Sequence, residues 1–380
     1  MLILVINAGS SSIKYQLFDL PHKDYVAKGV IERIGERKSF VHYNLKGSPP
    51  LNKNVKIGDH RQGIKLLLSL LTDKKFGALN SLKQLSGIGH RVVHGGEEFR
   101  MPCLITGGVL KKIKEYGRLA PLHNPAEASV IEACLACLRG VPQVAVFDTA
   151  FHSSMPERAY MYGLPYRLYK NFGIRRYGFH GTSHQYVVHE AAKVMNRPLN
   201  KLKLITCHLG NGCSMAAVEG GKSIDTSMGF TPMEGLVMGT RPGDFDPSII
   251  LFLLKNNYKI SEINDILNRK SGLLGLSGLS NDVRDINKAV KRNNKRAKLA
   301  IDVFVYRIQK YVGAYVAVLG GLDALIFTAG IGENQSGLRA NICAGLKFLL
   351  KVTGAKILVI KTDEEYMISR QAYSIIKKIK

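Results

Sequence analysis

The sequence is poor in cysteine and has no recognisable leader segment. Six cysteines among 380 residues are too few for a disulfide scaffold. Cys134 and Cys137 lie in a helical pattern without a second Cys or His pair at ligand spacing, which favours packed thiols over a metal site. The apolar start, Leu2 to Ile6, is short and has no basic stretch before it, so it is interpreted as a buried strand. We therefore expect a cytoplasmic protein.

Acidic residues are also scarce. The chain has 29 Asp and Glu against 54 Lys and Arg, a formal net charge of +25, which favours anionic partners in general. The densest basic stretch, Lys288 to Lys298, follows a helical pattern without interleaved aromatic residues, as a solvated helix face would. The longest apolar segment, Val312 to Gly332, is divided by glycines and Asp323 into a helix end, a turn and a strand. We expect neither nucleic acid nor a membrane as partner.

Three common catalytic signatures are missing. There is no GxxxxGK[ST] motif, which excludes an ordinary P-loop nucleotide site. The Ser-rich turn near the N-terminus lacks a GxSxG elbow, and no His, Cys and Asp cluster has zinc spacing. A serine or zinc hydrolase is therefore weakly supported.

What the chain does contain is a duplicated pattern. Leu2 to Leu20 and Leu204 to Val218 each run from a short apolar strand through a Gly/Ser turn into a returning strand. Small residues at a hairpin tip let backbone N–H groups approach an anion closely, so two tips predict two halves that face one phosphate chain. The remaining strands alternate with helices, which predicts an α/β fold of two similar domains with a cleft between them. We expect one domain at residues 1–150, completed by a C-terminal helix at 366–380, and the other at residues 151–365.

Two arginines stand in glycine-flanked loops. Arg91 follows a strand and precedes two glycines, and Arg241 lies in the long irregular stretch Thr226 to Pro247. A guanidinium group can hold a carboxylate or a phosphate through two hydrogen bonds and stays charged at any relevant pH. Either arginine alone is more readily explained as a surface or ion-pair residue. Two of them on glycine-flanked loops in a phosphate-cradling chain leave this interpretation and an anion site equally open.

Three further candidates stand at the ends of predicted elements. Asp148 follows the strand Val144 to Phe147, at the edge of the sheet where ligands usually bind. His123 and His180 precede predicted helices in turns framed by proline or glycine. A His donor and the free N–H groups of a helix start suit a phosphoryl group in transit. A purely structural role for each histidine stays open.

Two motifs near the C-terminus each allow two interpretations. Gly330 to Asn334 (GIGEN) lies between a strand and a helix, where it forms either a nucleotide dock or a tight turn. Thr362 to Glu365 (TDEE) opens the final helix, which Thr362 or Asp363 would cap. One of its carboxylates could equally share a magnesium ion with one helper residue.

The ordered set of motifs closely resembles the acetate kinase family, part of the superfamily that includes actin, sugar kinases and Hsp70-type ATPases. The resemblance spans nearly the whole chain. It comprises NAGSSSIK, GHRVVHGG, PLHNP, FDTAFH, YGFHGTSH, HLGNGCS, DTSMGFTPMEGLVMGTRPGD, GIGEN and TDEE. It implies two duplicated ribonuclease H-like, actin-like ATPase domains.

The resemblance also implies a role for each candidate residue. Asn7 and Glu364 would hold Mg²⁺, or Mn²⁺ in its place. Arg91 and Arg241 would hold the carboxylate and stabilise the moving phosphoryl group, and Asp148 would position the acetate and the arginines. His180 and Asn211 would contact the γ-phosphoryl group, with His123 as a supporting donor. The implied nucleotide-binding residues are Lys14, His208, Leu209, Gly210, Asn211, Gly212, Asp282, Arg284, Gly330, Ile331, Gly332, Glu333 and Asn334. The implied acyl pocket consists of Val93, Leu122, Phe179 and Pro232, beside Arg91.

The implied activity is a reversible, magnesium-dependent, in-line transfer of the ATP γ-phosphoryl group to acetate, giving acetyl phosphate and ADP. The family also implies a homodimer. The alternatives are a kinase for propionate or another short acid, and an inactive actin-like nucleotide-binding module. The branched Val93 favours acetate, and the presence of Arg91, Asp148, His180 and Arg241 argues against an inactive module. The chain is also expected to be shorter than typical members between Asn334 and Thr362.

Overall fold

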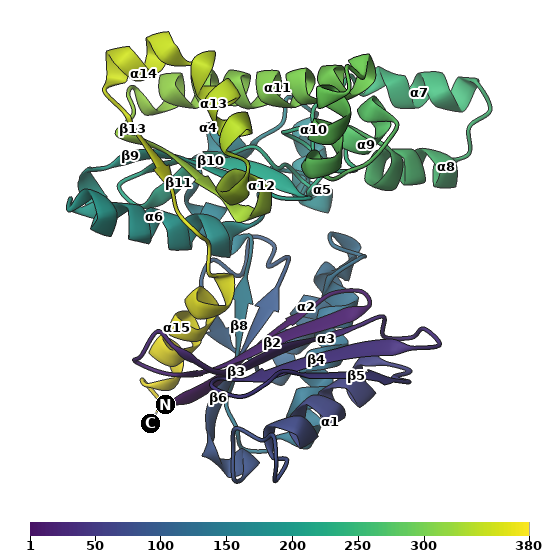
Figure 1. Ribbon diagram of the computed structural model, residues 1–380, viewed down its shortest axis with the longest axis vertical. Coiled ribbons are helices and arrows are strands. Elements are labelled where there is room, and N and C mark those ends of the chain that lie inside the picture. The colour runs from purple at the N-terminus through teal and green to yellow at the C-terminus, as the bar shows by residue number, and fades with distance from the viewer. Residues whose placement is uncertain (380) are drawn as a thin grey trace. The chain divides into compact units, whose positions relative to one another are not determined.

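The computed structural model describes residues 1–379 (Figure 1). Contacts between Cα atoms divide the chain into two compact units. The first consists of Met1–Phe151 together with the C-terminal segment from Asp363, and the second of His152–Thr362. The sequence-based boundaries lie at 150 and 365, so the structure places Glu364 with the first unit. The predicted C-terminal helix at 366–380 includes Lys380, which lies outside the described residues.

The first unit is built on a sheet in the order β5-β4-β3-β2-β1-β6-β8-β7. β1 pairs antiparallel with β2, from Leu2 opposite Asp19 to Ala8 opposite Ile13, as the predicted hairpin requires. β6 pairs parallel with both β1 and β8, so the carboxyl ends of β1, β6 and β8 meet at one edge of the sheet. The strands are β1 (Leu2–Ala8), β2 (Ser12–Asp19), β3 (Tyr25–Glu32), β4 (Ser39–Leu45), β5 (Leu51–Val55), β6 (Leu85–Val92), β7 (Cys103–Leu104) and β8 (Gln143–Phe147).

Helices pack against both faces of this sheet. One core cluster joins α1 (His60–Leu71) and α3 (Asn124–Cys137) to inward side chains of β1 to β4, among them Ile13 and Ile31. α2 (Gly107–Glu115) packs against α3 in a cluster that includes Ile113, Ile131 and Phe147. A third cluster joins α15 (Glu364–Ile376) to Val5 and Val146. Short 3-10 turns lie at Leu82–Gln84, Tyr116–Arg118 and Ala150–Ser154.

The packing of α15 brings the start of this last helix to the edge of the first sheet where the carboxyl ends of β1, β6 and β8 meet. Asp363 is its N-cap, accepting a hydrogen bond from the Tyr366 N–H at 3.0 Å, as one of the two interpretations predicted. A Cβ atom on Gly89 of β6 would lie 2.9 Å from Ile368 of α15. The helix therefore packs directly on the strand backbone, and Glu364 is held close to the ends of β1 and β6.

The second unit repeats the strand pattern of the first. Its sheet has the order β11-β10-β9-β12-β13, in which β9 pairs antiparallel with β10 and parallel with β12. β12 and β13 are also parallel, so the five strands match β3-β2-β1-β6-β8 of the first unit in order and direction. The prediction of two duplicated α/β domains is confirmed at this level. The strands are β9 (Lys203–Leu209), β10 (Cys213–Glu219), β11 (Lys222–Thr226), β12 (Ala324–Thr328) and β13 (Lys356–Val359).

Within the second unit, α6 and α11 lie on opposite faces of the sheet (Figure 1). α11 also packs against α9, α10 and α13. The helices are α4 (Glu157–Tyr160), α5 (Tyr166–Phe172), α6 (Gly181–Met195), α7 (Ser248–Lys255), α8 (Ile260–Asp265), α9 (Gly272–Ser277), α10 (Val283–Lys291), α11 (Lys295–Leu319), α12 (Ala329–Asn334), α13 (Ser336–Ala344) and α14 (Lys347–Thr353). A 3-10 turn at Leu199–Lys201 and a π-helical turn at Ile266–Lys270 complete the unit.

The longest apolar segment is divided as predicted. α11 ends at Leu319, Gly320 adopts a left-handed conformation with φ +61°, and β12 follows from Ala324. No helix among the described residues is both long and apolar enough to cross a membrane. Two local expectations need correction. The basic stretch is divided between α10 and α11 by Arg292 to Asn294, and the predicted glycine turn after β12 is itself the short helix α12.

Candidate active site

The first cluster of predicted residues lies at the carboxyl ends of three parallel strands. Asn7 is near the end of β1, Arg91 is in β6, and Asp148 directly follows β8. Arg91 donates from Nε and Nη2 to Asp148 Oδ2 at 3.1 and 2.5 Å, and from Nη1 to Asn7 Oδ1 at 3.1 Å. The Asp148 side chain is 2% exposed. One guanidinium group therefore links all three strand ends and neutralises a buried carboxylate.

Electrostatics keeps this arginine charged. Burial by itself would lower the pKa of Arg91, but Asp148 and Glu364 raise it above its ordinary value. Glu364 is placed nearby by the first turn of α15. Burial raises the pKa of Glu364 to about 7, against the opposing effect of Arg91 and Lys14. The carboxyl group of Glu364 is thus short of a compensating cation.

The oxygen atoms at this edge fit a magnesium ion. Mg²⁺ prefers oxygen ligands and usually keeps several waters, so one amide oxygen and one carboxylate are a sufficient protein contribution. Asn7 and Glu364 supply these two groups, and a cation beside Glu364 would oppose the effect of burial, which raises the pKa of this carboxyl group. Residues 1–379 contain no group of three or more His, Cys, Asp or Glu placed to hold a metal. A cation bound here would therefore depend on water or substrate oxygens to complete its shell.

Three side chains hold the backbone just after Arg91. The Val93 N–H donates to Glu127 Oε2 at 3.0 Å, and the Gly95 N–H donates to Thr149 Oγ1 at 3.0 Å. Between them, Asn124 accepts from the His94 N–H at 3.1 Å and donates to the His94 carbonyl at 3.0 Å. Sequence analysis missed all three. Asn124 and Thr149 lie within the motifs PLHNP and FDTAFH, directly after the predicted residues His123 and Asp148. This position next to predicted site residues is the sequence feature that could have identified them.

His123 and Leu122 stand immediately before α3. His123 is the N-cap residue of this helix, and its side chain makes no capping hydrogen bond. The Leu122 side chain is well exposed, in contrast to Val93, which is buried. Of the predicted acyl-pocket residues in the first unit, Val93 is therefore the one whose position is fixed by packing and by hydrogen bonding.

The second cluster gathers around the tip of the β9–β10 hairpin. The Gly210 N–H donates to the Gly212 carbonyl at 3.1 Å and closes the turn. A Cβ atom on Gly212 would lie 2.7 Å from Arg241 Nη2 and 3.3 Å from His180 Cε1. The absence of a side chain at Gly212 thus permits the side chains of Arg241 and His180 to reach the hairpin tip.

Arg241 is a half-buried cation without an anionic partner. Its Nη1 donates to the Pro232 carbonyl, and among the described residues it forms no ion pair. Burial lowers the pKa of Arg241, because no carboxylate compensates the guanidinium charge. An anion bound at this hairpin tip would supply the missing charge.

His180 is held in a strained position beside this arginine. It is the N-cap residue of α6 and has φ +56°, a left-handed conformation that is costly for a residue with a side chain. Its Nδ1 lies 2.9 Å from Ser214 Oγ, which in turn lies 2.8 Å from His184 Nε2. The ring also stacks on His208, with 4.2 Å between centroids. These contacts fix the orientation of the imidazole.

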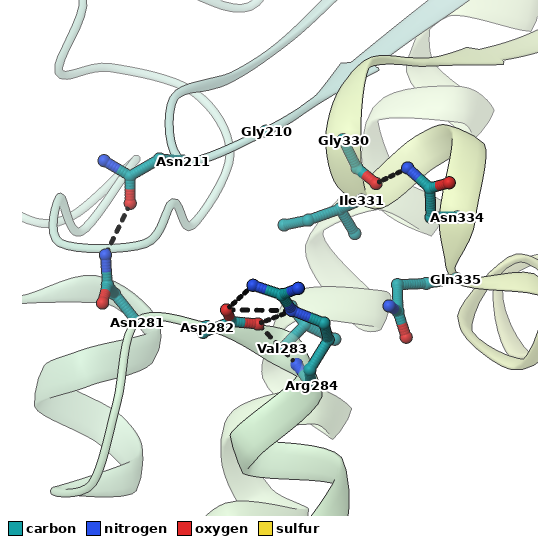
Figure 2. A pocket seen from close by; sticks show the side chains of 10 residues that line it. All are labelled: Gly210, Asn211, Asn281, Asp282, Val283, Arg284, Gly330, Ile331, Asn334 and Gln335. Carbon is teal, nitrogen blue, oxygen red and sulfur yellow. Dashed lines mark hydrogen bonds and ion pairs between the residues drawn. The ribbon is translucent and has the colours of Figure 1, made fainter. Parts of the chain in front are cut away.

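A pocket of about 430 Å³ opens next to the hairpin tip (Figure 2). Asn281 at the start of α10 donates to Asn211 Oδ1 at 2.9 Å, and Asp282 pairs with Arg284 at 2.6 Å. Predicted residues that line the pocket are Gly210, Asn211, Asp282, Arg284, Gly330, Ile331 and Asn334. Asn281, Val283 and Gln335 also line it and were missed, although each directly adjoins a predicted residue.

Other predicted nucleotide-binding residues lie elsewhere. Glu333 Oε1 accepts from the Ala329 N–H at 2.8 Å and from the Thr362 N–H at 3.1 Å, so this side chain links the start of its own helix to the segment before α15. His208 Nδ1 lies 2.8 Å from Ser183 Oγ, and Lys14 belongs to the first unit, opposite Asn7 in the hairpin. Leu209, Gly212 and Gly332 are likewise not among the residues that line the pocket within residues 1–379. In the described part of the second unit, Phe179 is buried and its carbonyl accepts from His152 Nε2 at 3.0 Å.

Comparison with known proteins gives one consistent result. Residues 2–376 match the acetokinase family. The acetate kinase of Halothermothrix orenii is 52% identical over 398 aligned positions, covering 99% of this chain and all of that protein. The crystal structure of the Porphyromonas gingivalis acetate kinase matches with a TM-score of 0.93 at 42% identity, covering 99% of each chain. That of a propionate kinase from Francisella tularensis matches with a TM-score of 0.91 at 41% identity, covering 98% of this chain and 99% of that one.

The ion pair at the first strand edge makes a testable prediction. In Arg91→Met, the buried Asp148 carboxylate loses the guanidinium group that neutralises it, so we expect unfolding of the first unit to require about 3–5 kcal/mol less. The double variant Arg91→Met with Asp148→Asn removes both charges and should recover part of this loss. Urea unfolding followed by circular dichroism measures both.

The control is Arg284→Met, which removes an exposed arginine that also pairs with an aspartate. Its unfolding midpoint should stay at the wild-type value, since exposed ion pairs contribute little. A double variant no more stable than Arg91→Met alone would contradict this account of the Arg91 and Asp148 pair.

Proposed function

Because the chain belongs to the acetokinase family, we propose that it transfers the γ-phosphoryl group of ATP reversibly to acetate, giving acetyl phosphate and ADP. The observation that best supports this reaction is the contrast between its two arginines. Arg91 is oriented by a carboxylate partner, whereas Arg241 lies without a counter-ion at a glycine hairpin tip. The first arrangement suits a small carboxylate acceptor, and the second suits a phosphate chain.

On this proposal, Arg91 holds the acceptor. Asp148 occupies Nε and Nη2 of Arg91, which fixes the plane of the guanidinium group and the direction in which the remaining N–H bonds can point. Acetate arrives already deprotonated at neutral pH, so no general base is required. Asp148 therefore acts by positioning Arg91 and the acetate.

Residues of the second unit would compensate the negative charge of the phosphoryl group during its transfer. The phosphoryl group passes through a loosely bonded transition state with negative charge on its equatorial oxygens. Arg241, His180 and Asn211 at the hairpin tip would stabilise this charge, with the backbone N–H groups of Asn211 and Gly212, and with His123 of the first unit as a supporting donor. None of these groups needs to form a covalent bond with the phosphoryl group.

The pocket of about 430 Å³ would hold the nucleotide. Asp282 and Arg284 would contact the ribose and base, and Gly330 to Asn334 the α-phosphate region, with Lys14, His208 and Leu209 in supporting positions. Asn7 and Glu364 would hold Mg²⁺, which when bound neutralises charge on the phosphates. We further propose that the two units close over the substrates, because water in the site would hydrolyse ATP.

Acetate is the proposed acceptor because of the pocket around its methyl group. Val93, Leu122, Phe179 and Pro232 would line this pocket, and the branched Val93 leaves little room beyond a methyl group. One additional methylene group changes discrimination by about 1–3 kcal/mol. Propionate is therefore the alternative acceptor to be tested.

A hydroxamate assay with acetate, propionate and butyrate tests the function. We expect acetate to have the highest kcat/KM, with propionate lower by about 10-fold to 200-fold, the usual range for one methylene group. Asp148→Asn, nearly identical in size, should lose at least about 100-fold, because Arg91 is no longer fixed by a charged partner. Equal or better use of propionate would favour the alternative, and no product with any acid would contradict the proposal.

We also propose that the enzyme is a homodimer formed through its second unit. α7 exposes several apolar side chains, including Leu251 at 61% and Phe252 at 64%. Ile249 and Leu254 on the same helix are exposed as well. Several exposed large apolar side chains on one short helix are a feature of protein interfaces.

Phe252→Glu should therefore shift the molar mass in light scattering from that of a dimer to the 41.9 kDa of one chain, because it places a charge in the apolar interface. Phe348→Glu is the matched control, since Phe348 on α14 is 81% exposed and lies outside α7, and this variant should stay dimeric. A monomeric wild-type protein, or a dimeric Phe252→Glu variant, would rule out this interface.

A further inference from the structure

The acidic residue Glu127 is buried next to the proposed acetate site and takes no direct part in the proposed transfer. It lies in the first turn of α3 and is 1% exposed. Its Oε2 accepts the Val93 N–H at 3.0 Å, while Oε1 is buried and has no hydrogen-bond partner within the described residues. A buried carboxyl group with one unpartnered oxygen is costly, and such groups are retained where they serve a purpose.

Glu127 is part of a set of contacts that fixes three consecutive residues. Glu127, Asn124 and Thr149 bind the backbone N–H groups of Val93, His94 and Gly95, respectively. Two of these three anchors come from the first turn of α3. The anchored segment begins two residues after Arg91, at the residue proposed to face the acetate methyl group.

We propose that Glu127 is a positioning residue of the acetate site, whose carboxyl group holds Val93 and thereby sets the acyl pocket and the strand end that carries Arg91. This inference rests on the proposed function, because Val93 and Arg91 matter only if a small carboxylate is the acceptor. Glu127 itself does not touch the substrate. It acts through the Val93 backbone.

The protonation state of Glu127 is part of this role. Among the described residues, the charged groups that act on it are Arg91 of β6, which favours its ionised form, and Asp148 after β8, which opposes it. Burial outweighs the attraction to Arg91 and raises the pKa of Glu127 to about 8. At neutral pH the Glu127 carboxyl group is mainly uncharged, so it does not compete with Asp148 for the guanidinium group of Arg91. Above that pH, ionised Glu127 would attract Arg91 and repel Asp148, and acetate binding should weaken.

Two variants separate these effects. Glu127→Gln keeps the carbonyl acceptor and the size of the protonated side chain but is uncharged at every pH. Glu127→Met has similar length and no comparable acceptor. Initial rates in the acyl phosphate assay, with acetate and with propionate between pH 6 and 9.5, provide the readout for each variant beside the wild type.

Glu127→Gln should keep its acetate KM within about two-fold of wild type at pH 7 and lack the rise in acetate KM that we expect of wild type above about pH 8. Glu127→Met should raise the acetate KM about ten-fold, with the KM for MgATP unchanged, because the Val93 N–H loses its partner. The preference for acetate over propionate should also fall in this variant. A purely structural role would lower the amount of active enzyme and leave both KM values as they are.

The outcomes distinguish this inference from the proposed function. A wild-type protein that phosphorylates neither acid overturns the function. If the wild type is active but Glu127→Met has unchanged KM values, the role of Glu127 is overturned and the function is not. The same holds if Glu127→Gln and Glu127→Met raise the acetate KM equally. If Glu127→Met does not fold, the pH dependence of the acetate KM tests the inference instead. An identical alkaline rise of this KM in Glu127→Gln and in wild type would overturn it.

Discussion

The buried pair of Arg91 and Asp148 is the interaction on which the rest of the account depends. An almost fully buried carboxylate is costly without a compensating cation, and a guanidinium group can bind it through two N–H bonds while still offering N–H bonds to other groups. Parallel pairing of β1, β6 and β8 brings Asn7, Arg91 and Asp148 to one edge of the sheet. The packing of α15 on β6 then adds Glu364 to the same edge. Backbone topology thus creates a concentrated set of charges from residues that are far apart in the chain.

The two units use the same strand order for different chemistry. In the first, the strand ends carry an arginine that is already paired, a metal-compatible pair of oxygens and a small apolar residue. In the second, the corresponding hairpin ends in glycines, and Arg241 lies near them without a counter-ion. On the proposed function, the duplicated sheet would supply two anion sites of unequal character. A reaction between a carboxylate and a phosphate chain requires this inequality, because the acceptor must be oriented while the transferred group must be neutralised.

The sequence predicted most of what depends on local pattern. Both hairpins, the division of the apolar segment before β12 and the Asp363 cap of α15 follow from short runs of residues, and the structure confirms them. Motif resemblance also identified most of the lining of the pocket in Figure 2.

Glu127 and Thr149 were missed because their hydrogen bonds reach residues 34 and 54 positions away, which only the tertiary fold brings close. Glu333 was assigned to the nucleotide because of its motif, whereas its side chain bonds to N–H groups of Ala329 and Thr362. The spacing of a motif does not determine which way each side chain points.

The central claim is that residues of both units act on one phosphoryl group, which requires the units to close around it. Small-angle X-ray scattering with MgADP, aluminium fluoride and acetate imitates the transfer state, and MgADP alone is the matched control. The account predicts a smaller radius of gyration for the complete mixture than for MgADP alone. An unchanged radius, with binding of all the components verified by calorimetry, would contradict it.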